Sequence, residues 1–338
     1  MIKTYTSRKL RALRFADTVR QGAGIIEGKI TQIADNQLLI HNRYAGVNGL
    51  FDRAIIRNEV PYRFLQPPID MGVEAIGTVV EIGKDVVNFQ IGDSVSTTRF
   101  GQGYREYQAE DASKVWKIKS LNPEYVALRP TAVSALVALE QVGQMKTNEV
   151  VAVSAAAGGL GQFVVQFAQM AGNKVVGICG GKEKFDFLNT LGCDLVIDYK
   201  SQNVGEVLKK HFPDGINLVY DTVGGELFDQ FVDNLAIRGR IIVSGYASDM
   251  GGEGLPASIN RPRIYEQIYW KAAQIRCFQN ALYTEFHDEA SRRILELYES
   301  KKLKVKLDNT KFIGIESLYD AIEYLCSGQS IGKVVLEF

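Results

Sequence analysis

The chain has 338 residues, 46% of them hydrophobic and 23% charged, which is typical of a globular protein larger than one hydrophobic core usually supports. Its 39 Lys and Arg balance 39 Asp and Glu, so no net field favours nucleic acid or an anionic membrane. No apolar run approaches the roughly 18 residues of a membrane span. We therefore expect two domains and neither a nucleic-acid nor a membrane partner.

The amino-terminal segment and the cysteines bear on the compartment. The first twenty residues are basic but lack a long apolar core, which argues against a secretory signal. Leu10–Phe15 fits either an organelle transit peptide or a first strand. The four cysteines contain no C-x2-C pair, so neither a structural zinc nor a disulfide framework is indicated. A reducing compartment, most simply the cytoplasm, is expected.

The first 122 residues have the pattern of a β-rich domain. Short runs of strand-forming residues alternate with glycine and with Asp-Asn turns. These runs cover residues 28–33, 38–47, 72–82, 103–108 and 114–118. Short strands at this spacing predict a small barrel-like β domain.

From Pro123 the hydrophobic period changes. A helix-spaced segment, Thr131–Val142, comes first, and strict alternation of strands and helices follows. The predicted strands are Glu149–Ser154, Lys174–Cys179, Asp194–Asp198, Ile216–Asp221, Arg240–Ser244 and Gln274–Phe278. The predicted helices are Gln162–Met170, Lys182–Leu191, Val204–Phe212, Glu226–Leu235 and Arg263–Trp270. Six strands joined by helical crossovers predict an α/β fold with a doubly wound parallel sheet.

The last part of the chain is expected to return to the β domain. Phe286–Tyr298 is amphipathic, Ile315–Cys326 has helical spacing, and Lys333–Phe338 has the pattern of a final strand. We therefore predict one domain from residues 1–122 and 300–338. The second domain, residues 123–299, is inserted between them.

A small-residue turn follows the first strand of the alternating region. Ala156-x-Gly158-x-x-Gly161 is the dinucleotide fingerprint with alanine in place of its first glycine. In this motif Gly158 lets the backbone approach a pyrophosphate, and Gly161 lets the next helix pack against the strand. An ordinary strand-to-helix turn is the alternative. The second strand, Lys174–Cys179, closes a βαβ unit of about 30 residues and favours nucleotide binding.

Several blocks carry a resemblance to a known family. They are Gly72–Gly77, Phe89–Val95, Ser154–Gly161 and Gly328–Lys333, with further blocks at Leu191–Asp194, Asp198–Lys200, Val219–Tyr220, Val223–Gly225 and Gly239–Gly245. Through them the whole chain resembles the medium-chain dehydrogenase/reductase superfamily, most nearly its zinc-free prostaglandin reductase 3 type. The resemblance implies a GroES-like β domain with a Rossmann domain, and NADPH-dependent reduction of a carbon–carbon double bond conjugated to a ketone.

The tip of the second strand indicates which nucleotide is used. NAD-binding folds usually place Asp or Glu there, whereas this strand ends in Gly180 and Gly181. Lys182 and Lys184 follow, with Glu183 the only nearby acid, so NADPH is favoured over NADH. In related reductases the residues matching Lys184 and Tyr199 contact the 2′-phosphate.

The resemblance implies further cofactor contacts along the chain. They are Asn48, Ser134, Gly158, Gly159, Leu160, Gly161, Gly180, Gly181, Thr222, Ser244, Gly245, Tyr246, Met250, Phe278, Gln279 and Ser330. Ser330 stands where relatives commonly have asparagine.

No metal is expected. Zinc members of the superfamily have a cysteine near residues 46–49 and a histidine in a Gly-His-Glu block, where this chain has Asn48 and Val73. Its three histidines lie elsewhere, and zinc needs several convergent nitrogen or sulfur ligands. Glu74 is then most simply a structural, hydrogen-bonded carboxylate.

Without zinc, the expected chemistry is hydride transfer to the β-carbon of an enone, with donors holding the carbonyl oxygen as charge develops. The candidate catalytic residues are Asn48 and Tyr246, and less directly Tyr44, Tyr62 or Tyr265. The glycine-rich stretch 250–254 and the segment 261–269 are expected to form a lid over the substrate.

Two other functions remain open from the sequence. A quinone accepts hydride with the same geometry, so a quinone reductase is one alternative. A non-catalytic NADPH-binding protein is the other. Relatives are commonly dimers, and Gln274–Phe278 could pair as an edge strand with a second copy.

Overall fold

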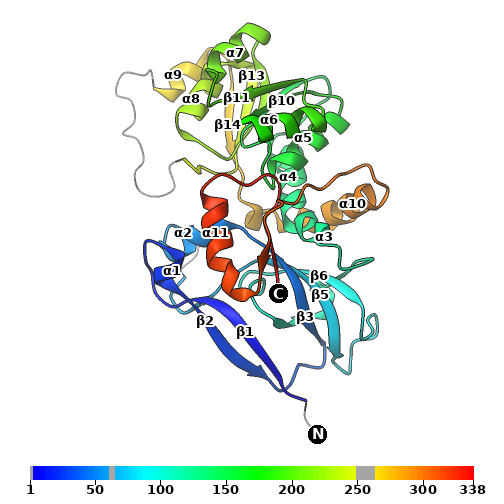
Figure 1. Ribbon diagram of the computed structural model, residues 1–338. Helices are drawn as coiled ribbons and strands as arrows, with labels where there is room; N and C mark the ends of the chain where they lie inside the picture. Colours follow the sequence, from blue (N-terminus) through cyan, green and yellow to red (C-terminus); the bar gives the residue numbers. More distant parts are fainter. Residues whose placement is uncertain (1–2, 61–64, 249–262) are drawn as a thin grey trace. The chain divides into compact units, whose positions relative to one another are not determined.

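A computed structural model describes residues 3–60, 65–248 and 263–338 (Figure 1). The chain divides into two compact units. The first comprises residues 1–130 and 306–338, and the second comprises residues 131–305. The second unit is therefore inserted into the chain of the first.

The first unit is mostly β structure. Its strands are β1 Tyr5–Ala12, β2 Ala23–Ile30, β3 Gln37–Gly46, β4 Ile69–Asp70, β5 Glu74–Ile82, β6 Ser94–Thr98, β7 Tyr107–Asp111, β8 Trp116–Lys117, β15 Phe312–Ile313 and β16 Val335–Glu337. Its helices are α1 Val19–Gly22, α2 Gly49–Ile56, α3 Glu124–Ala127 and α11 Leu318–Cys326.

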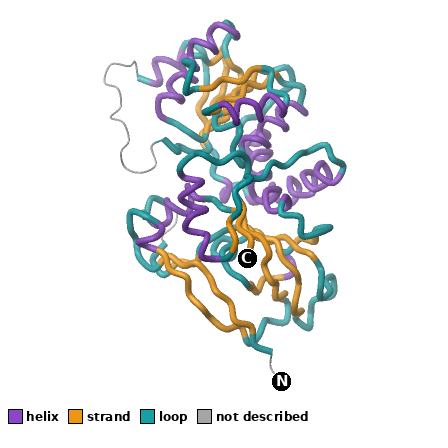
Figure 2. The backbone as a smooth tube through the Cα atoms, viewed as in Figure 1, coloured by secondary structure: helices purple, strands orange, loops and turns teal. Residues whose placement is uncertain are grey.

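These strands form two sheets, which appear in orange in Figure 2. One has the order β2-β1-β4, and the other has the order β15-β16-β3-β5-β6-β8, with β7 also paired to β3. Alternate residues of β3, Leu38 and Ile40, face a core with Val79, Val95 and Val115. This inward alternation is what holds the register of the larger sheet.

The predicted β-rich character of this region is confirmed, although several bounds differ: the run expected at 103–108 is β7 at Tyr107–Asp111, and the run expected at 114–118 shortens to β8. The strand expected at residues 28–33 runs from Ala23 to Ile30 instead, because Ile30 pairs with Tyr5 and Ala23 with Ala12. Residues 49–56 form a helix, α2, that the sequence did not predict. Leu10 lies within β1, so the strand alternative for the amino-terminal segment is the one the structure has.

The second unit alternates strands and helices. Its strands are β9 Val150–Val153, β10 Lys174–Cys179, β11 Leu195–Asp198, β12 Ile216–Asp221, β13 Leu235–Val243 and β14 Gln274–Cys277. Its helices are α4 Val133–Val137, α5 Gly161–Met170, α6 Lys182–Leu191, α7 Val204–His211, α8 Gly225–Asp233, α9 Ile264–Tyr269 and α10 His287–Glu299.

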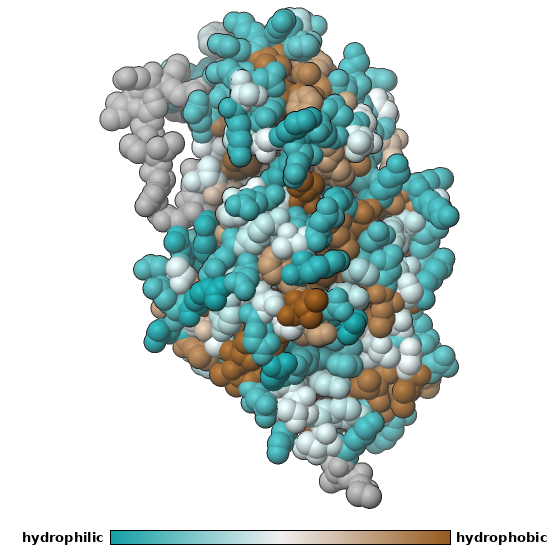
Figure 3. Space-filling model, viewed as in Figure 1, coloured by the Kyte–Doolittle hydropathy of each residue, from teal (hydrophilic) through white to brown (hydrophobic). Residues whose placement is uncertain are grey.

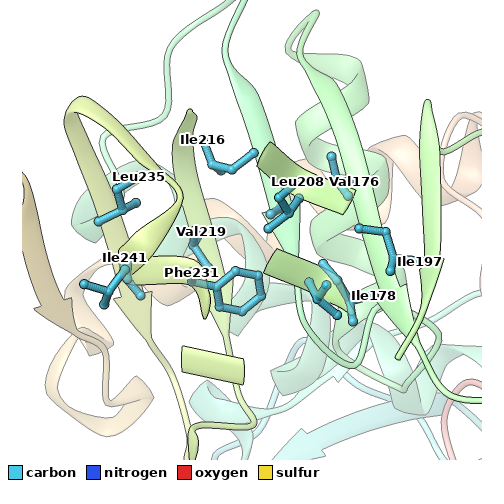
Figure 4. Close-up of a cluster of buried hydrophobic side chains, with 12 residues drawn as sticks. Val176, Ile178, Ile197, Leu208, Ile216, Val219, Phe231, Leu235 and Ile241 are labelled. Atoms are coloured by element: carbon cyan, nitrogen blue, oxygen red, sulfur yellow. The ribbon is translucent and has the colours of Figure 1, made fainter. Parts of the chain in front are cut away.

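The six strands are all parallel, in the order β11-β10-β9-β12-β13-β14. This order confirms the predicted doubly wound sheet. The strand order proceeds from β9 to β11 on one side and from β12 to β14 on the other, so the order reverses between β9 and β12. In Figure 4, Leu208 of α7 and Phe231 of α8 pack against sheet residues that include Val176 and Val219. Continuous apolar strands covered by such helices are what a parallel sheet requires.

Strand β13 starts at Leu235 rather than at Arg240 as predicted. Its register against β12 shifts between Ile216 and Leu218, so residues 236–239 have no partner in this ladder. The exposed Ile237 and Arg238 in this bulge interrupt the apolar pattern, which is why the sequence placed the start too late.

Most of the molecular face in Figure 3 is hydrophilic, with smaller hydrophobic patches. Among the described residues, no helix has both the length and the apolar character needed to cross a bilayer.

Candidate cofactor site and buried polar cluster

The turn between β9 and α5 is built for close backbone approach. A Cβ added at Gly161 would lie 2.4 Å from the carbonyl oxygen of Ala155 and 2.7 Å from the Cα of Ala156, so a side chain does not fit there. At Gly158 the nearest atom would be 3.2 Å away. Gly161 therefore brings α5 against the end of β9, as the third glycine of the fingerprint does.

Helix α5 presents its amino terminus at this turn. No side chain caps it, and its first turn contains no acidic residue. Its backbone N–H groups and the positive end of its dipole suit an anion such as a diphosphate. Gly158, Gly159, Leu160 and Gly161 lie in this turn, so the structure brings these four expected contacts together.

The tips of β10 and β11 form the next part of the site. A Cβ at Gly180 would lie 2.7 Å from the ring of Tyr199, so the tyrosine ring packs over the glycine. Gly181 has a φ of 96°, and its N–H donates to Oδ1 of Asp198 at 3.0 Å. Asp198 is not among the predicted site residues, because this carboxylate ends the third strand rather than the second.

The two lysines after β10 differ in their surroundings. Nζ of Lys182 lies 2.8 Å from Oδ2 of Asp186 in an exposed pair on α6, which fits a solvated helix face. Lys184 lies in the first turn of α6. It is close enough to Cys179 to act to lower the pKa of that thiol, although burial raises this pKa to about 11. Lys184 therefore lies near the end of β10.

Ser154 and Asp221 join the ends of β9 and β12, where the strand order reverses. The Ser154 hydroxyl donates to Oδ1 of Asp221 at 2.6 Å and accepts from the N–H of Thr222 at 2.9 Å. The N–H groups of Val223 and Gly224 donate to the same carboxylate. Burial raises the pKa of Asp221, against the lowering effect of these donors. The sequence analysis missed this pair, although two polar residues at the ends of apolar strands were a visible signal.

The expected contacts after β12 and β13 lie beside Thr222. The Thr222 carbonyl accepts from the N–H of Ala247 at 3.1 Å, and a Cβ at Gly245 would lie 3.0 Å from it. Ser244 Oγ accepts from the phenol of Tyr220 at 3.0 Å. Tyr246, in the same loop, is 47% exposed.

Two residues after β14 complete this edge. Phe278 is buried, and its N–H donates to the carbonyl of Val243 at 2.8 Å. The Gln279 side chain accepts from the N–H of Ala281 at 2.6 Å, so its oxygen supports a local turn. All these segments follow the carboxyl ends of parallel strands, which is the edge where ligands bind in such sheets.

The remaining expected site residues have other locations. Ser134 is buried in α4 of the second unit. Asn48, Tyr44 and Ser330 belong to the first unit. Met250, Tyr62 and the side chain of Tyr265 lie outside the described structure, as does most of the expected lid.

Asn48 is part of a buried polar cluster in the first unit. Nζ of Lys333 lies 2.7 Å from Oε1 of Glu74 and donates to Oδ1 of Asn48 at 2.9 Å. Nδ2 of Asn48 in turn donates to Oε2 of Glu74 at 2.7 Å. The lysine and glutamate side chains are 4% and 1% exposed. Glu74 is thus a hydrogen-bonded carboxylate, as predicted, whereas its cation, Lys333, was missed.

This geometry fixes the amide of Asn48. Its oxygen and one N–H are held by Lys333 and Glu74, which leaves the second N–H for another acceptor. Asn48 precedes α2 without capping it, because its side chain is engaged in the cluster. A Cβ at Gly46 would lie 2.2 Å from Oε1 of Glu74, so the carboxylate occupies space that only glycine leaves.

A second buried acid adjoins the cluster. Tyr104 donates to Oδ2 of Asp52 at 2.6 Å and accepts from the N–H of Asn48 at 3.3 Å. Complete burial raises the pKa of Asp52 to about 7, and Glu74 adds to this. No local pattern in the sequence indicates this pair.

Across residues 3–60, 65–248 and 263–338, no three or more His, Cys, Asp or Glu side chains come together in a way that could hold a metal ion. His41 stacks on Tyr107, with ring centroids 4.4 Å apart.

The donors at the sheet edge of the second unit fit a dinucleotide. This edge has a turn in which a Cβ at Gly161 does not fit, the amino terminus of α5 without a side-chain cap, and the ring of Tyr199 packed over Gly180.

A doubly wound sheet with such an edge, inserted into a β unit, defines a two-domain nucleotide-dependent dehydrogenase fold. Residues 34–128 match the alcohol dehydrogenase GroES-like domain, and residues 159–308 match the zinc-binding dehydrogenase family. The chain is 35% identical to mouse prostaglandin reductase-3 over 314 residues, covering 90% of this chain and 81% of the relative. It is 32% identical to a probable quinone oxidoreductase of Leishmania amazonensis, covering 98% and 97%.

The fold has solved counterparts. Escherichia coli quinone oxidoreductase, in complex with NADPH, superimposes with a TM-score of 0.83 at 22% identity, covering 99% of this chain and 100% of that one. The chain belongs to the medium-chain dehydrogenase/reductase superfamily and is an oxidoreductase of that class.

Proposed function

We propose that this protein is an NADPH-dependent, zinc-independent reductase of the carbon–carbon double bond of α,β-unsaturated ketones. The observation that carries the proposal is the β10 tip, where Tyr199 packs over Gly180, Lys184 lies near Cys179, and glycine rather than a carboxylate follows the strand. A relative named prostaglandin reductase-3 and structural neighbours solved with NADPH support the same choice.

The described residues have distinct roles in binding the cofactor. Backbone N–H groups from Gly158 to Gly161 would hold the diphosphate at the start of α5. Lys184 and Tyr199 would hold the 2′-phosphate. NADPH, when bound, supplies the hydride. Thr222 and the loop 244–246 are candidates for the nicotinamide half of the cofactor.

The chain must also supply donors for the substrate carbonyl. Asn48 in the first unit, through its second N–H, and Tyr246 in the second unit, through its phenol, are each a candidate for this role. Lys333 and Glu74 orient Asn48 before substrate binds, so little ordering remains for catalysis. A donor of this kind typically lowers the barrier by about 2.7–4 kcal/mol. The proton for the α-carbon would come from water or from Tyr246.

A quinone reductase is the second candidate. The Leishmania relative, matched over nearly its whole length, is named a probable quinone oxidoreductase, and this supports it. The same donors would hold a quinone oxygen. Because the geometry of hydride transfer does not distinguish the two acceptor classes, turnover measured with each class separates the two functions.

We further propose a homodimer in the cytoplasm. Among the described strands, β14 is one of the two edges of its sheet, and Tyr269 and Trp270, just before it, are 71% and 86% exposed. An unpaired edge beside exposed aromatic residues suits pairing with a second copy. The four cysteines are all free thiols, which suits a reducing compartment.

The decisive experiment measures NADPH and NADH oxidation with a panel of enones and quinones. We expect NADPH turnover with enones, and Lys184→Gln should raise the KM for NADPH about tenfold while leaving that for NADH unchanged. Lys182→Gln is the matched control, because Lys182 already pairs with Asp186. Equal use of both nucleotides, or turnover of quinones alone, would contradict the proposed function.

A further inference from the structure

We propose that the second unit has another anion-binding site, on the sheet edge opposite the nucleotide site. A cavity of about 480 Å³ lies there. Its lining includes Glu149, which directly precedes β9, and Gln274, the first residue of β14. Parallel strands begin at one edge and end at the other, so this cavity, called here the basic pocket, is separate from the dinucleotide edge.

The floor of the basic pocket is a complete ion pair. Arg240 donates to both carboxylate oxygens of Glu149, at 2.6 and 3.0 Å. Its other N–H groups donate to the carbonyls of Gly143, Gln144 and Asn217. Burial acts to raise the pKa of Glu149, but Arg240 holds that pKa below its usual value. The one carboxylate of the pocket is therefore already neutralised.

Three further cations line the basic pocket, whose lining holds no carboxylate besides Glu149. They are Lys146, Arg238 and Arg276. Among the described residues, the acceptors of Arg276 are neutral oxygens, those of Val142 and of the Gln274 side chain. Within the described residues, no salt bridge involves any of the three. Four cations against one carboxylate leave three positive charges around one cavity, and an anion would relieve their repulsion.

The backbone around the basic pocket is unusual as well. Gln144, Arg238 and Ala272 have φ values of 47°, 61° and 47°. These are three of the seven non-glycine residues in the left-handed region among the described residues. The bulge of β13 holds Arg238 in this conformation, and its N–H donates to the carbonyl of Lys271 at 2.7 Å. Such conformations are disfavoured and concentrate at ligand sites.

The chemistry of the basic pocket points to a compact oxyanion with two or more negative charges. Guanidinium groups bind phosphate and carboxylate groups through paired N–H donors. Both a phosphate compound and a polycarboxylate have this chemistry. Inorganic pyrophosphate and citrate are therefore the two probes, and their relative affinities tell the two sources apart.

The test is isothermal titration calorimetry of the full chain with each probe, at constant ionic strength and with NADPH saturating the nucleotide edge. We expect one site per chain. The double variant Lys146→Gln/Arg238→Gln should bind the better probe at least about tenfold more weakly. Lys209→Gln/Lys210→Gln, on exposed positions of α7, removes the same net charge and should bind normally.

Several results would overturn the site. One is that neither probe binds. Another is that the double variant and its control bind the better probe equally weakly, and the third is that NADPH abolishes binding of the probe. Sedimentation of each variant checks that the oligomeric state is unchanged. Should the double variant not fold, Lys146→Gln alone suffices, because Lys146 is exposed and its removal leaves the Arg240–Glu149 pair intact. A wild-type affinity in that variant counts against the site.

Discussion

Lys333, Glu74 and Asn48 show how much depends on a single buried charge. Lys333→Met would leave the Glu74 carboxylate buried without its cation. We expect a loss of about 3–5 kcal/mol in the free energy of unfolding, measured by urea denaturation. Lys333→Met combined with Glu74→Gln should recover part of this loss, because no charge then stays unpaired.

The control is an exposed pair of the same kind. Lys182→Met removes the partner of Asp186 on the surface of α6 and should cost less than about 1 kcal/mol. If Lys333→Met cost as little, the cluster would have to be solvated rather than buried.

The raised pKa of Asp52 predicts that the free energy of unfolding depends on pH. Its pKa is 3.8 in an ordinary setting and about 7 in the fold. Between these values the folded chain keeps a proton that the unfolded chain has lost, so stability falls as pH rises. The slope is about 1.4 kcal/mol per pH unit, or about 2 kcal/mol from pH 5 to 7.

Asp52→Asn removes this titration while keeping an acceptor for Tyr104. The stability of the variant relative to the wild type should therefore increase by about 2 kcal/mol from pH 5 to 7, by urea denaturation at each pH. Asp320→Asn, on the surface of α11, should show no such trend. A constant difference for Asp52→Asn across this range would show that Asp52 ionises normally.

At the level of elements, the β9–α5 turn depends on one glycine. Gly161→Ala would place a Cβ 2.4 Å from the Ala155 carbonyl and push α5 away from β9. We expect a loss of about 1–3 kcal/mol in stability and weaker NADPH binding, followed by thermal unfolding and by fluorescence titration. Gly28→Ala, in β2 with no atom within 4 Å of the added Cβ, should be neutral.

The elements whose bounds are predicted correctly are those whose residue pattern lies within one segment of the chain. Strands β10 and β12 and helix α6 have the predicted bounds, because apolar runs and amphipathic spacing are local properties. Helix α2 was missed because Gly49–Ile56 is short and ends in β-branched residues. The Lys333–Asn48 bond joins residues 285 positions apart, and no local pattern indicates such a contact.

The whole molecule should be a dimer if β14 pairs with a second copy. Sedimentation equilibrium should then give twice the chain mass of 37.5 kDa. Trp270→Ser removes an exposed aromatic residue beside this edge and should shift the protein toward the monomer. Val87→Ser, equally exposed at 85% but in the first unit, should not. A wild-type protein that sediments as a monomer would contradict the dimer.

The inserted topology also has a consequence for synthesis on the ribosome. The second unit has its complete sheet once residue 277 has emerged, and it can fold while translation continues. The first unit cannot, because β3 acquires β16 as a neighbour, and Glu74 acquires its lysine, only when residues 333–337 leave the exit tunnel. A chain released early would therefore expose an unpaired edge of β3 and leave the Glu74 carboxylate without its cation, and both features disfavour the folded first unit.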